Sequence, residues 1–320
     1  MAFFFVAVST KENLGLCKKF GLAGLPSTYN GLWGYLDMNI GDYITFLYGA
    51  RAHNLYKIVD KESILNAADM PPWESLEFSS GTVADFPYRF QLDTIRSLTE
   101  RIAKQEFAYI AENLLLRGGY RKSHFQADQT TLQNVSQMGD VFNGKTSKLQ
   151  MPPYETFIPK FMRKRGCDFP VFQFKEKILQ SLIRQYLSEK NHFAKFAEKF
   201  EIIDFPELDI EVLGEKALPE GHVDLLIKES RPIGTARQIV IEIKLTPAKA
   251  EDVQQLHQYM KSIGSECQAG ILIAETFQKK LTPKEGMRFC KYQFENFDIH
   301  KTPCSFEGLL DELKLIPVKL

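Results

Sequence analysis

The C-terminal half of the chain carries two apolar segments that are interrupted by charge, Gly221-His222-Val223-Asp224-Leu225-Leu226-Ile227 and Ile239-Val240-Ile241-Glu242-Ile243-Lys244-Leu245. Short runs of β-branched and apolar residues such as these predict strands. Because alternate side chains of a strand share a face, Glu242 and Lys244 point to one side and the flanking isoleucines to the other. The two segments therefore predict central strands that bring charged groups into a buried sheet.

Charged side chains inside a sheet are costly unless they are paired or bind a metal ion. One interpretation is structural: an ion pair of Glu242 with Lys244, or of Asp224 with a neighbouring base. The other is a metal site, because two carboxylates plus phosphate oxygens suit Mg²⁺, a hard cation that keeps several waters. There the metal would polarise a phosphate and help to generate hydroxide, while Lys244 would position water or stabilise charge.

Pro247 begins a segment that predicts a helix directly after these strands and that extends to residue 260. Proline suits a first turn, and Glu251 and Asp252 come early, where the helix dipole favours anions. Gln255 and Tyr259 are four residues apart and therefore project from one helix face. An ordinary amphipathic helix explains the same spacing, but the position directly after the Glu-X-Lys strand favours a role in the site.

Together, residues 221–260 resemble the PD-(D/E)XK nuclease superfamily. The Gln-X-X-X-Tyr helix makes them similar to its RecB-like and NucS-like branches. The resemblance implies that Asp224 and Glu242 bind metal, with Mg²⁺ as the expected cofactor and Mn²⁺ as a substitute, and that Lys244 is catalytic. The proline of the family name is absent, since Val223 stands before Asp224, at a position that varies in the family.

The resemblance also implies that Gln255 and Tyr259 orient the site or the DNA, and that an acidic residue on an earlier helix completes the site. Residues 174–187 predict such a helix, with apolar residues at positions 178, 179, 182, 183, 186 and 187. Glu176 lies along the edge of this apolar stripe and is the candidate acid. A surface ion pair is the alternative interpretation of Glu176.

With 320 residues and 44% apolar content, the chain is expected to form one large domain or two ordinary ones with real cores. Residues 151–167 hold three prolines and little periodicity, and they predict a linker between a domain of residues 1–150 and one of residues 168–320. Alternating elements in the second domain predict an α/β fold with a mixed central sheet. Its further expected elements are a strand at 269–274, a helix at 281–292 and a strand at 296–300.

The bulk properties narrow the classes of protein further. The net charge is zero, so nucleic-acid binding would need local basic patches. Five scattered cysteines without a Cys-X-X-Cys motif indicate a reducing compartment, expected to be the cytoplasm, and argue against structural zinc. The apolar start, residues 1–8, is too short for a membrane span and predicts a strand. No Gly-rich phosphate loop is present, so no NTP-driven motor is expected in this chain.

The N-terminal half is rich in aromatic residues and predicts strands at 3–8, 43–48 and 55–59, followed by helical segments near 95–117. An ordered series of short motifs resembles the YTH and EVE domains of the PUA-like group, and implies an α+β domain built on a β-barrel. The motifs are Phe4-Phe5-Val6-Ala7-Val8-Ser9, Asn13, Asn30-Gly31-Leu32-Trp33, Gly41-Asp42-Tyr43-Ile44-Thr45-Phe46, Trp73 and Tyr88-Arg89-Phe90.

Such domains bind a modified base in an aromatic cage. The resemblance implies that Trp33 and Trp73 are cage walls and that Asn13 is a polar contact to the base edge. A flipped base is read by stacking and by hydrogen bonds to its edge, and each stack contributes about 1–3 kcal/mol. The alternative is that both tryptophans are core residues.

A base reader joined to a metal nuclease predicts a modification-dependent restriction endonuclease, which is a Mg²⁺-dependent phosphodiester hydrolase. Its expected partner is double-stranded DNA that carries a modified base, and methylation is the expected modification. One such site cuts one strand, so a homodimer is expected for cleavage of both strands. Two alternatives stay open from sequence. One is a NucS-like endonuclease that repairs mismatched or damaged DNA, and the other is a non-catalytic reader of modified nucleic acid.

Overall fold

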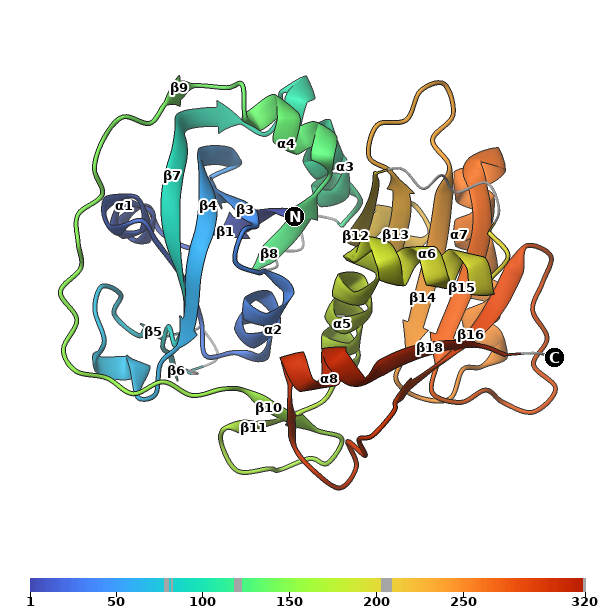
Figure 1. Cartoon of the computed structure of the whole chain (residues 1–320). Helices are drawn as coiled ribbons and strands as arrows, with labels where there is room; N and C mark the ends of the chain where they lie inside the picture. Colours follow the sequence, from blue (N-terminus) through green and yellow to red (C-terminus); the bar gives the residue numbers. More distant parts are fainter. Residues whose placement is uncertain (78–80, 82, 118–122, 203–208, 319–320) are drawn as a thin grey trace. The chain divides into compact units, whose positions relative to one another are not determined.

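The computed structural model describes residues 1–77, 81, 83–117, 123–202 and 209–318 (Figure 1). The chain divides into two compact units, Met1–Ile158 and Pro159–Leu320. This division falls inside the segment 151–167 that the prolines mark as a linker. None of the described helices is long and apolar enough to cross a membrane.

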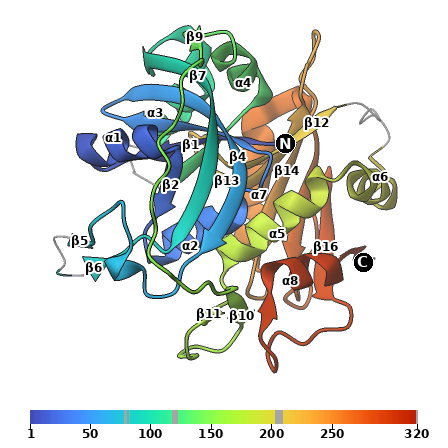
Figure 2. The ribbon, with the colours of Figure 1, turned by 60° about the vertical axis from the view of Figure 1, so that its left-hand side comes forward.

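The first unit is built on one curled sheet with the strand order β2-β7-β4-β3-β1-β8, to which β9 adds at β7. The strands β1 and β3 are parallel and the other pairs are antiparallel. Figure 2 shows β4 and β7 as the long, curved strands of this sheet. The strands are β1 (Phe3–Ala7), β2 (Leu22–Leu25), β3 (Tyr43–Tyr48), β4 (Arg51–Ser63), β7 (Tyr88–Arg101), β8 (His124–Ala127) and β9 (Asp140–Val141), and a separate pair is β5 (Leu76–Glu77) with β6 (Val83–Ala84).

The strand β1 is buried on both faces, since Phe3, Phe4 and Phe5 are all fully buried. The strands predicted at the chain start, at 43–48 and at 55–59 are confirmed. The helical prediction near 95–117 is wrong in its first part, because residues up to Arg101 continue β7. The helices are α1 (Lys11–Phe20), α2 (Tyr29–Asp37), α3 (Ala108–Leu116) and α4 (Gln129–Val135).

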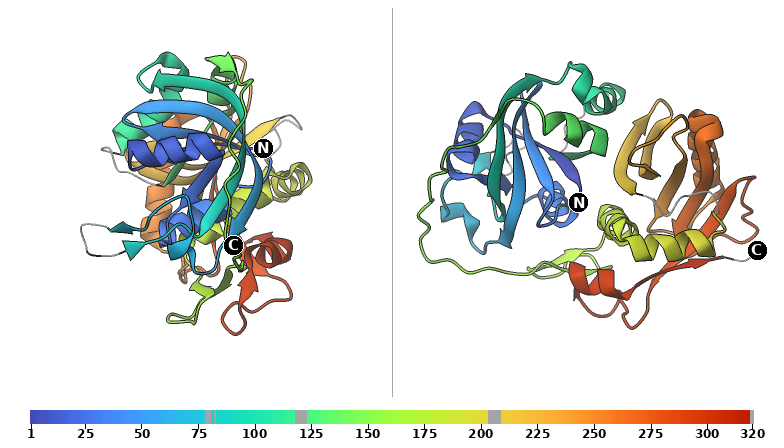
Figure 3. Two further views of the ribbon diagram at one scale, coloured as in Figure 1. Left: turned by 90° about the vertical axis from the view of Figure 1, so that its left-hand side faces the viewer. Right: turned by 45° about the horizontal axis from the view of Figure 1, so that its top comes forward.

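The second unit is a mixed α/β structure around a six-stranded sheet with the order β12-β13-β14-β15-β16-β18. The strands β14, β15 and β16 run parallel and the other neighbours antiparallel. Figures 1 and 3 show α5 and α6 on one face of this sheet and α7 on the other. The strands are β12 (Ile210–Leu218), β13 (Gly221–Glu229), β14 (Gln238–Lys244), β15 (Cys267–Ala274), β16 (Met287–Phe294) and β18 (Leu313–Pro317). The helices are α5 (Glu176–Ser188), α6 (Lys190–Lys199), α7 (Ala250–Ile263) and α8 (Phe306–Glu312).

Part of the predicted linker belongs to this second unit. The strand β10 (Lys160–Met162) pairs with β11 (Val171–Gln173) and with β17 (Cys304–Ser305) in a small sheet. The predicted strands 221–227, 239–245 and 269–274 and the helices at 174–187 and 247–260 are present, with helix starts shifted by two or three residues.

Two further predictions for the second unit are wrong. Residues 281–292 form no helix, because β16 occupies 287–294, and residues 296–300 form no strand. Pro283 and Gly286 interrupt a helix, and the buried Met287 and Phe289 stand on either side of the less buried Arg288, as in a strand.

Candidate active site and ligand pocket

The candidate active site forms where β13 and β14 stop pairing. Their antiparallel register runs from Lys228↔Gln238 to Leu225↔Ile241, one residue short of Asp224. There Asp224 Oδ2 accepts a hydrogen bond of 2.7 Å from the backbone N–H of Ile243. The Asp224 carboxylate thus replaces the backbone acceptor at the end of the β13–β14 pairing, and this hydrogen bond holds Asp224 beside Glu242.

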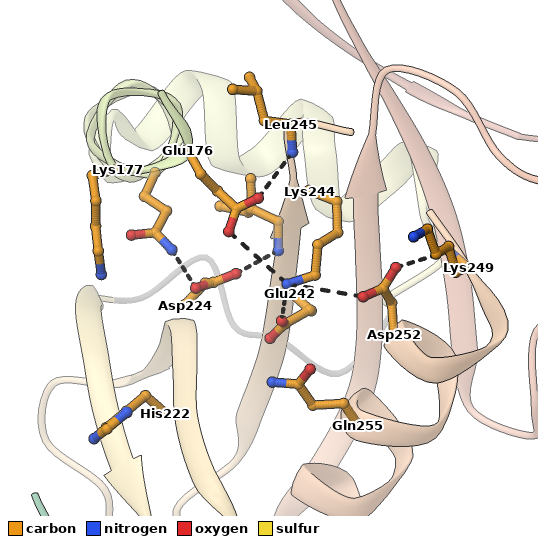
Figure 4. A network of polar contacts seen from close by, with 12 residues as sticks. Glu176, Lys177, His222, Asp224, Glu242, Lys244, Leu245, Lys249, Asp252 and Gln255 are labelled. Atoms are coloured by element: carbon orange, nitrogen blue, oxygen red, sulfur yellow. Dashed lines mark hydrogen bonds and ion pairs between the residues drawn. The ribbon is translucent and has the colours of Figure 1, made fainter. Parts of the chain in front are cut away.

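The ammonium group of Lys244 lies among carboxylates from three elements (Figure 4). Its Nζ donates to Glu242 Oε1 at 2.7 Å. It lies 4.0 Å from Glu176 Oε1 and 4.0 Å from Asp252 Oδ1. The fold therefore brings together four residues that the sequence predicts for the site: Glu176, Asp224, Glu242 and Lys244.

The ionisation of this site follows from burial and crowded charge. The pKa of Glu242 is raised to about 8, first by burial and then by the charge of Asp224, against the lowering effect of Lys244. Burial raises the pKa of Asp224 to about 6, against the effects of Lys244 and of the Ile243 N–H. Burial alone lowers the pKa of Lys244, but Glu242 and the other carboxylates raise it above its ordinary value. Lys244 is therefore a cation here, and one lysine leaves the carboxylate pair under-neutralised.

One carboxylate oxygen in the site has no partner. Glu242 Oε2 is buried and accepts no hydrogen bond from any described residue. A divalent cation bound to this oxygen and to Asp224 would offset the cost of burying both carboxylates. The described residues contain no group of three or more His, Cys, Asp or Glu side chains that could hold a metal. Two protein carboxylates with the remaining positions left to water and phosphate oxygens fit Mg²⁺ in charge and in donor type.

Glu176 is the first residue of α5, and this position aims it at the end of β14. Its Oε2 accepts a hydrogen bond from the backbone N–H of Leu245 at 3.1 Å. One turn later, the Gln180 amide donates to Asp224 Oδ1. Gln180 is almost fully buried and was not predicted from the sequence. Its spacing of four residues from Glu176 places both side chains on one helix face and could have indicated it.

Gln255 and Tyr259 hold the start of β13 rather than the carboxylates. Gln255 Nε2 donates to Tyr259 Oη at 2.6 Å, and Tyr259 Oη donates to the carbonyl of His222 at 3.1 Å. Gly221 makes this approach possible, because a Cβ there would lie 2.7 Å from Tyr259 Oη and its φ is +147°. Both side chains thus support the backbone two residues before Asp224, a positioning contact.

Asp252 is a second site residue that was not predicted from the sequence. Its Oδ2 accepts a hydrogen bond of 2.8 Å from the backbone N–H of Lys249, which caps α7. Its other oxygen faces Lys244 at 4.0 Å. The early position of Asp252 in the helix was a visible signal, but that signal indicates capping and gives no hint of the contact with Lys244.

The first unit contains a pocket of about 430 Å³ whose lining includes Asn13 and Trp73. The ring of Trp73 lies 5.4 Å from the ring of Phe86, centroid to centroid, and both side chains line the pocket. Trp33 is absent from the lining and is buried with its ring 4.3 Å from that of His124. Of the three predicted base contacts, the fold brings Asn13 and Trp73 together and places Trp33 elsewhere in the unit.

Close packing gives this pocket its aromatic wall. Gly24 lies under the Trp73 ring, since a Cβ there would be 2.6 Å from a ring carbon. Asn13 lines the pocket from the first turn of α1, where Thr10 caps the helix and accepts a hydrogen bond from the Asn13 backbone N–H at 3.0 Å. The pocket thus combines aromatic side chains with polar groups in its lining, a composition typical of ligand sites.

No family model matches the chain, and no curated protein matches it. Among solved structures, a repair endonuclease from Pyrococcus abyssi is 25% identical over 32% of this chain and 45% of its own, with a TM-score of 0.22. The MmI1 YTH domain is 14% identical over 42% of this chain and 92% of its own, with a TM-score of 0.29. The DNA modification-dependent restriction endonuclease AspBHI is 10% identical over 92% of this chain and 75% of its own, with a TM-score of 0.21.

These likenesses are partial. The chain spans less than half the length of the repair endonuclease. All three TM-scores lie well below 0.5, so the chain's own side chains must carry any functional conclusion.

Proposed function

We propose that this protein is a modification-dependent restriction endonuclease. In this proposal the second unit is a PD-(D/E)XK nuclease domain, and the first is a YTH- or EVE-like domain that receives a flipped, modified base. The observation that carries the proposal is the partly buried Asp224 beside the buried Glu242, with the unpartnered Glu242 Oε2 and the adjoining Lys244 cation. The aromatic pocket of the first unit supports the second half of the proposal.

The proposed reaction is hydrolysis of a phosphodiester bond in double-stranded DNA. Asp224 and Glu242 would hold Mg²⁺, or Mn²⁺ in its place, and the metal when bound supplies polarisation of the phosphate and a more acidic water. Lys244, held as a cation by its carboxylate neighbours, stabilises negative charge that develops on the phosphate or orients water. Glu176 holds the end of β14 through the backbone N–H of Leu245, and Gln180 holds the carboxylate of Asp224. A homodimer would cut both strands.

The test is digestion of matched duplexes that carry N6-methyladenine, 5-methylcytosine, 5-hydroxymethylcytosine or no modification, with Mg²⁺ and with the ends sequenced. Cleavage near one modified base and little cleavage of the unmodified duplex are expected. Equal cutting of all duplexes would contradict the proposal. Preference for a mismatched duplex would instead favour a repair endonuclease, and selective binding without metal-dependent cutting would favour a non-catalytic reader.

Gln180 gives a prediction about metal affinity. Methionine at this position keeps the length of the side chain but cannot donate to Asp224 Oδ1. We expect Gln180→Met to weaken Mg²⁺ or Mn²⁺ binding by about 10- to 100-fold, the loss typical of removing an outer-shell partner. Calorimetric titration of the metal into the whole chain measures this. The control is Gln258→Met on the exposed side of α7, and equal affinities of the two variants would contradict the role of Gln180.

The two tryptophans give a second prediction. Trp73→Leu removes a stacking face from the pocket and should weaken binding of the preferred modified duplex by about 1–3 kcal/mol. Trp33→Phe keeps an aromatic ring against His124 and should change that affinity less than about twofold. The readout is the ratio of affinities for modified and unmodified duplexes, which partial unfolding would leave unchanged. A loss of selectivity in the Trp33 variant alone would show that Trp33 is the cage wall.

A further inference from the structure

A buried polar chain in the first unit ends at a residue that lines the pocket. His124 Nε2 lies 3.2 Å from Asp37 Oδ2, and His124 Nδ1 lies 3.1 Å from Ser123 Oγ. Ser123 Oγ in turn can donate to the carbonyl oxygen of Asn30 at 3.1 Å. His124 and Asp37 are more than nine-tenths buried, while Ser123 and Asn30 both line the pocket.

The α2 helix holds the imidazole ring in place. Trp33 and Asp37 are four residues apart on this helix and therefore share a face, with the Trp33 ring 4.3 Å from the ring of His124. Gly34 leaves space for the imidazole, since a Cβ there would lie 3.0 Å from His124 Nδ1. The ring thus has little freedom to turn away from Ser123.

The hydrogen-bond partners of Ser123 decide whether its hydroxyl can donate to, or accept from, a ligand in the pocket. An ionised carboxylate only accepts, so His124 Nε2 facing Asp37 carries a hydrogen. If His124 Nδ1 has no hydrogen, the Ser123 hydroxyl donates to it. If His124 Nδ1 carries a hydrogen, it donates to Ser123 Oγ, and the hydroxyl donates to the carbonyl of Asn30. In both states the single hydroxyl hydrogen is used inside the protein, and Ser123 Oγ keeps a lone pair.

We propose that Ser123 Oγ is a hydrogen-bond acceptor that selects a base with an exocyclic amino group, and that Asp37 and His124 position it. This inference rests on the proposed function of the pocket as the site of a flipped base. Modified adenines and cytosines present an exocyclic N–H and would be accepted. Modified uracils present exocyclic carbonyl oxygens, which would face another lone pair and leave two acceptors unpaired. The pocket therefore discriminates between classes of base by the polarity of one hydroxyl.

The test uses the whole chain in EDTA, so that binding is measured without cleavage. The probes are duplexes that differ at one position, which is N6-methyladenine, 5-methylcytosine, 5-hydroxymethylcytosine or 5-hydroxymethyluracil. At least one of the three amino bases should bind tenfold or more tightly than the uracil derivative. Ser123→Ala should weaken binding of the best amino-base duplex by about five- to tenfold, the value of one net hydrogen bond. Ser123→Thr, which keeps the hydroxyl, should stay within about twofold of the parent.

The hydrogen bond between the base and Ser123 Oγ can also be removed by changing the ligand and leaving the protein unaltered. Dimethylation of the exocyclic nitrogen of the best base removes its N–H, and the parent and Ser123→Ala should bind this duplex with equal affinity. His124→Phe keeps a ring against Trp33 and leaves the carbonyl of Asn30 as the remaining partner of the Ser123 hydroxyl. It should therefore lose less affinity than Ser123→Ala, and the double variant should lose no more than Ser123→Ala alone. Additive losses would overturn the positioning role of His124.

Two other results would overturn the assignment as a whole. Tightest binding of the hydroxymethyluracil duplex, or an unchanged affinity in Ser123→Ala, would remove Ser123 as the selecting acceptor while leaving the base-reading function intact. Equal binding of every modified and unmodified duplex by the parent would overturn the proposed function of the pocket, and this assignment with it.

Discussion

Replacement of Lys244 by methionine is expected to slow DNA cleavage by at least about a hundred- to a thousandfold, the loss typical of removing one preorganised charge-stabilising donor. Methionine keeps an unbranched stem but carries no charge, so the variant loses the cation that lies 2.7 Å from Glu242 Oε1. The loss should appear in the chemical step, because Lys244 belongs to the second unit and the pocket to the first. Single-turnover cleavage of the preferred modified duplex at saturating Mg²⁺ measures it.

Two controls separate this effect from loss of fold or of DNA binding. Lys279→Met removes an exposed lysine after β15 and should cut at the parent rate. In EDTA, the Lys244 variant should bind the modified duplex within about twofold of the parent. Normal cutting by Lys244→Met would rule out a catalytic role for Lys244, and a parallel loss of modified-base binding would point to misfolding.

The elements that carry the site could be predicted because their signals are local. The strand around Glu242 is a continuous apolar run, and Gln255 and Tyr259 follow it at helical spacing on α7. Gln180 and Asp252 could not be assigned from the same signals. Each is a polar residue on an amphipathic helix. Gln180 differs from its exposed neighbours only in its contact with Asp224, and Asp252 only in its contact with Lys244, and both partners lie outside the helix concerned.

The N-terminal half shows a different limit. The strand positions followed from alternation and turn residues, but the sequence gives no sign of which tryptophan faces the pocket. Trp33 lies on α2 and is directed at His124, while Trp73 precedes β5 and packs over Gly24. Both are equally buried, so residue type and burial do not separate a wall from a core residue. Only the curl of the sheet, which brings residues 13, 24, 73 and 123 around one pocket, decides it.

Glu242→Gln is expected to have opposite effects on metal binding and on the stability of the metal-free protein. Burial and Asp224 raise the pKa of Glu242 to about 8, well above the ordinary value of about 4.3 for an unfolded chain. Below pH 4 the carboxyl is protonated in both states. As pH rises toward 8 the unfolded chain ionises first, so the stability of the metal-free protein should fall across this window. Glutamine does not ionise, and the variant should lose much of this decline.

The measurement is the melting temperature of parent and variant in EDTA between pH 4 and pH 9. The variant should melt higher than the parent at pH 8, by about 2–4 °C for each kcal/mol recovered. With Mg²⁺ the order should reverse, because only the parent gains stability from the metal, and cleavage by the variant should fall by more than about a hundredfold. Glu251→Gln on the exposed side of α7 is the control. A Glu242 variant that melts below the parent in EDTA at pH 8 would mean that Glu242 serves as the structural partner of Lys244 and holds no metal.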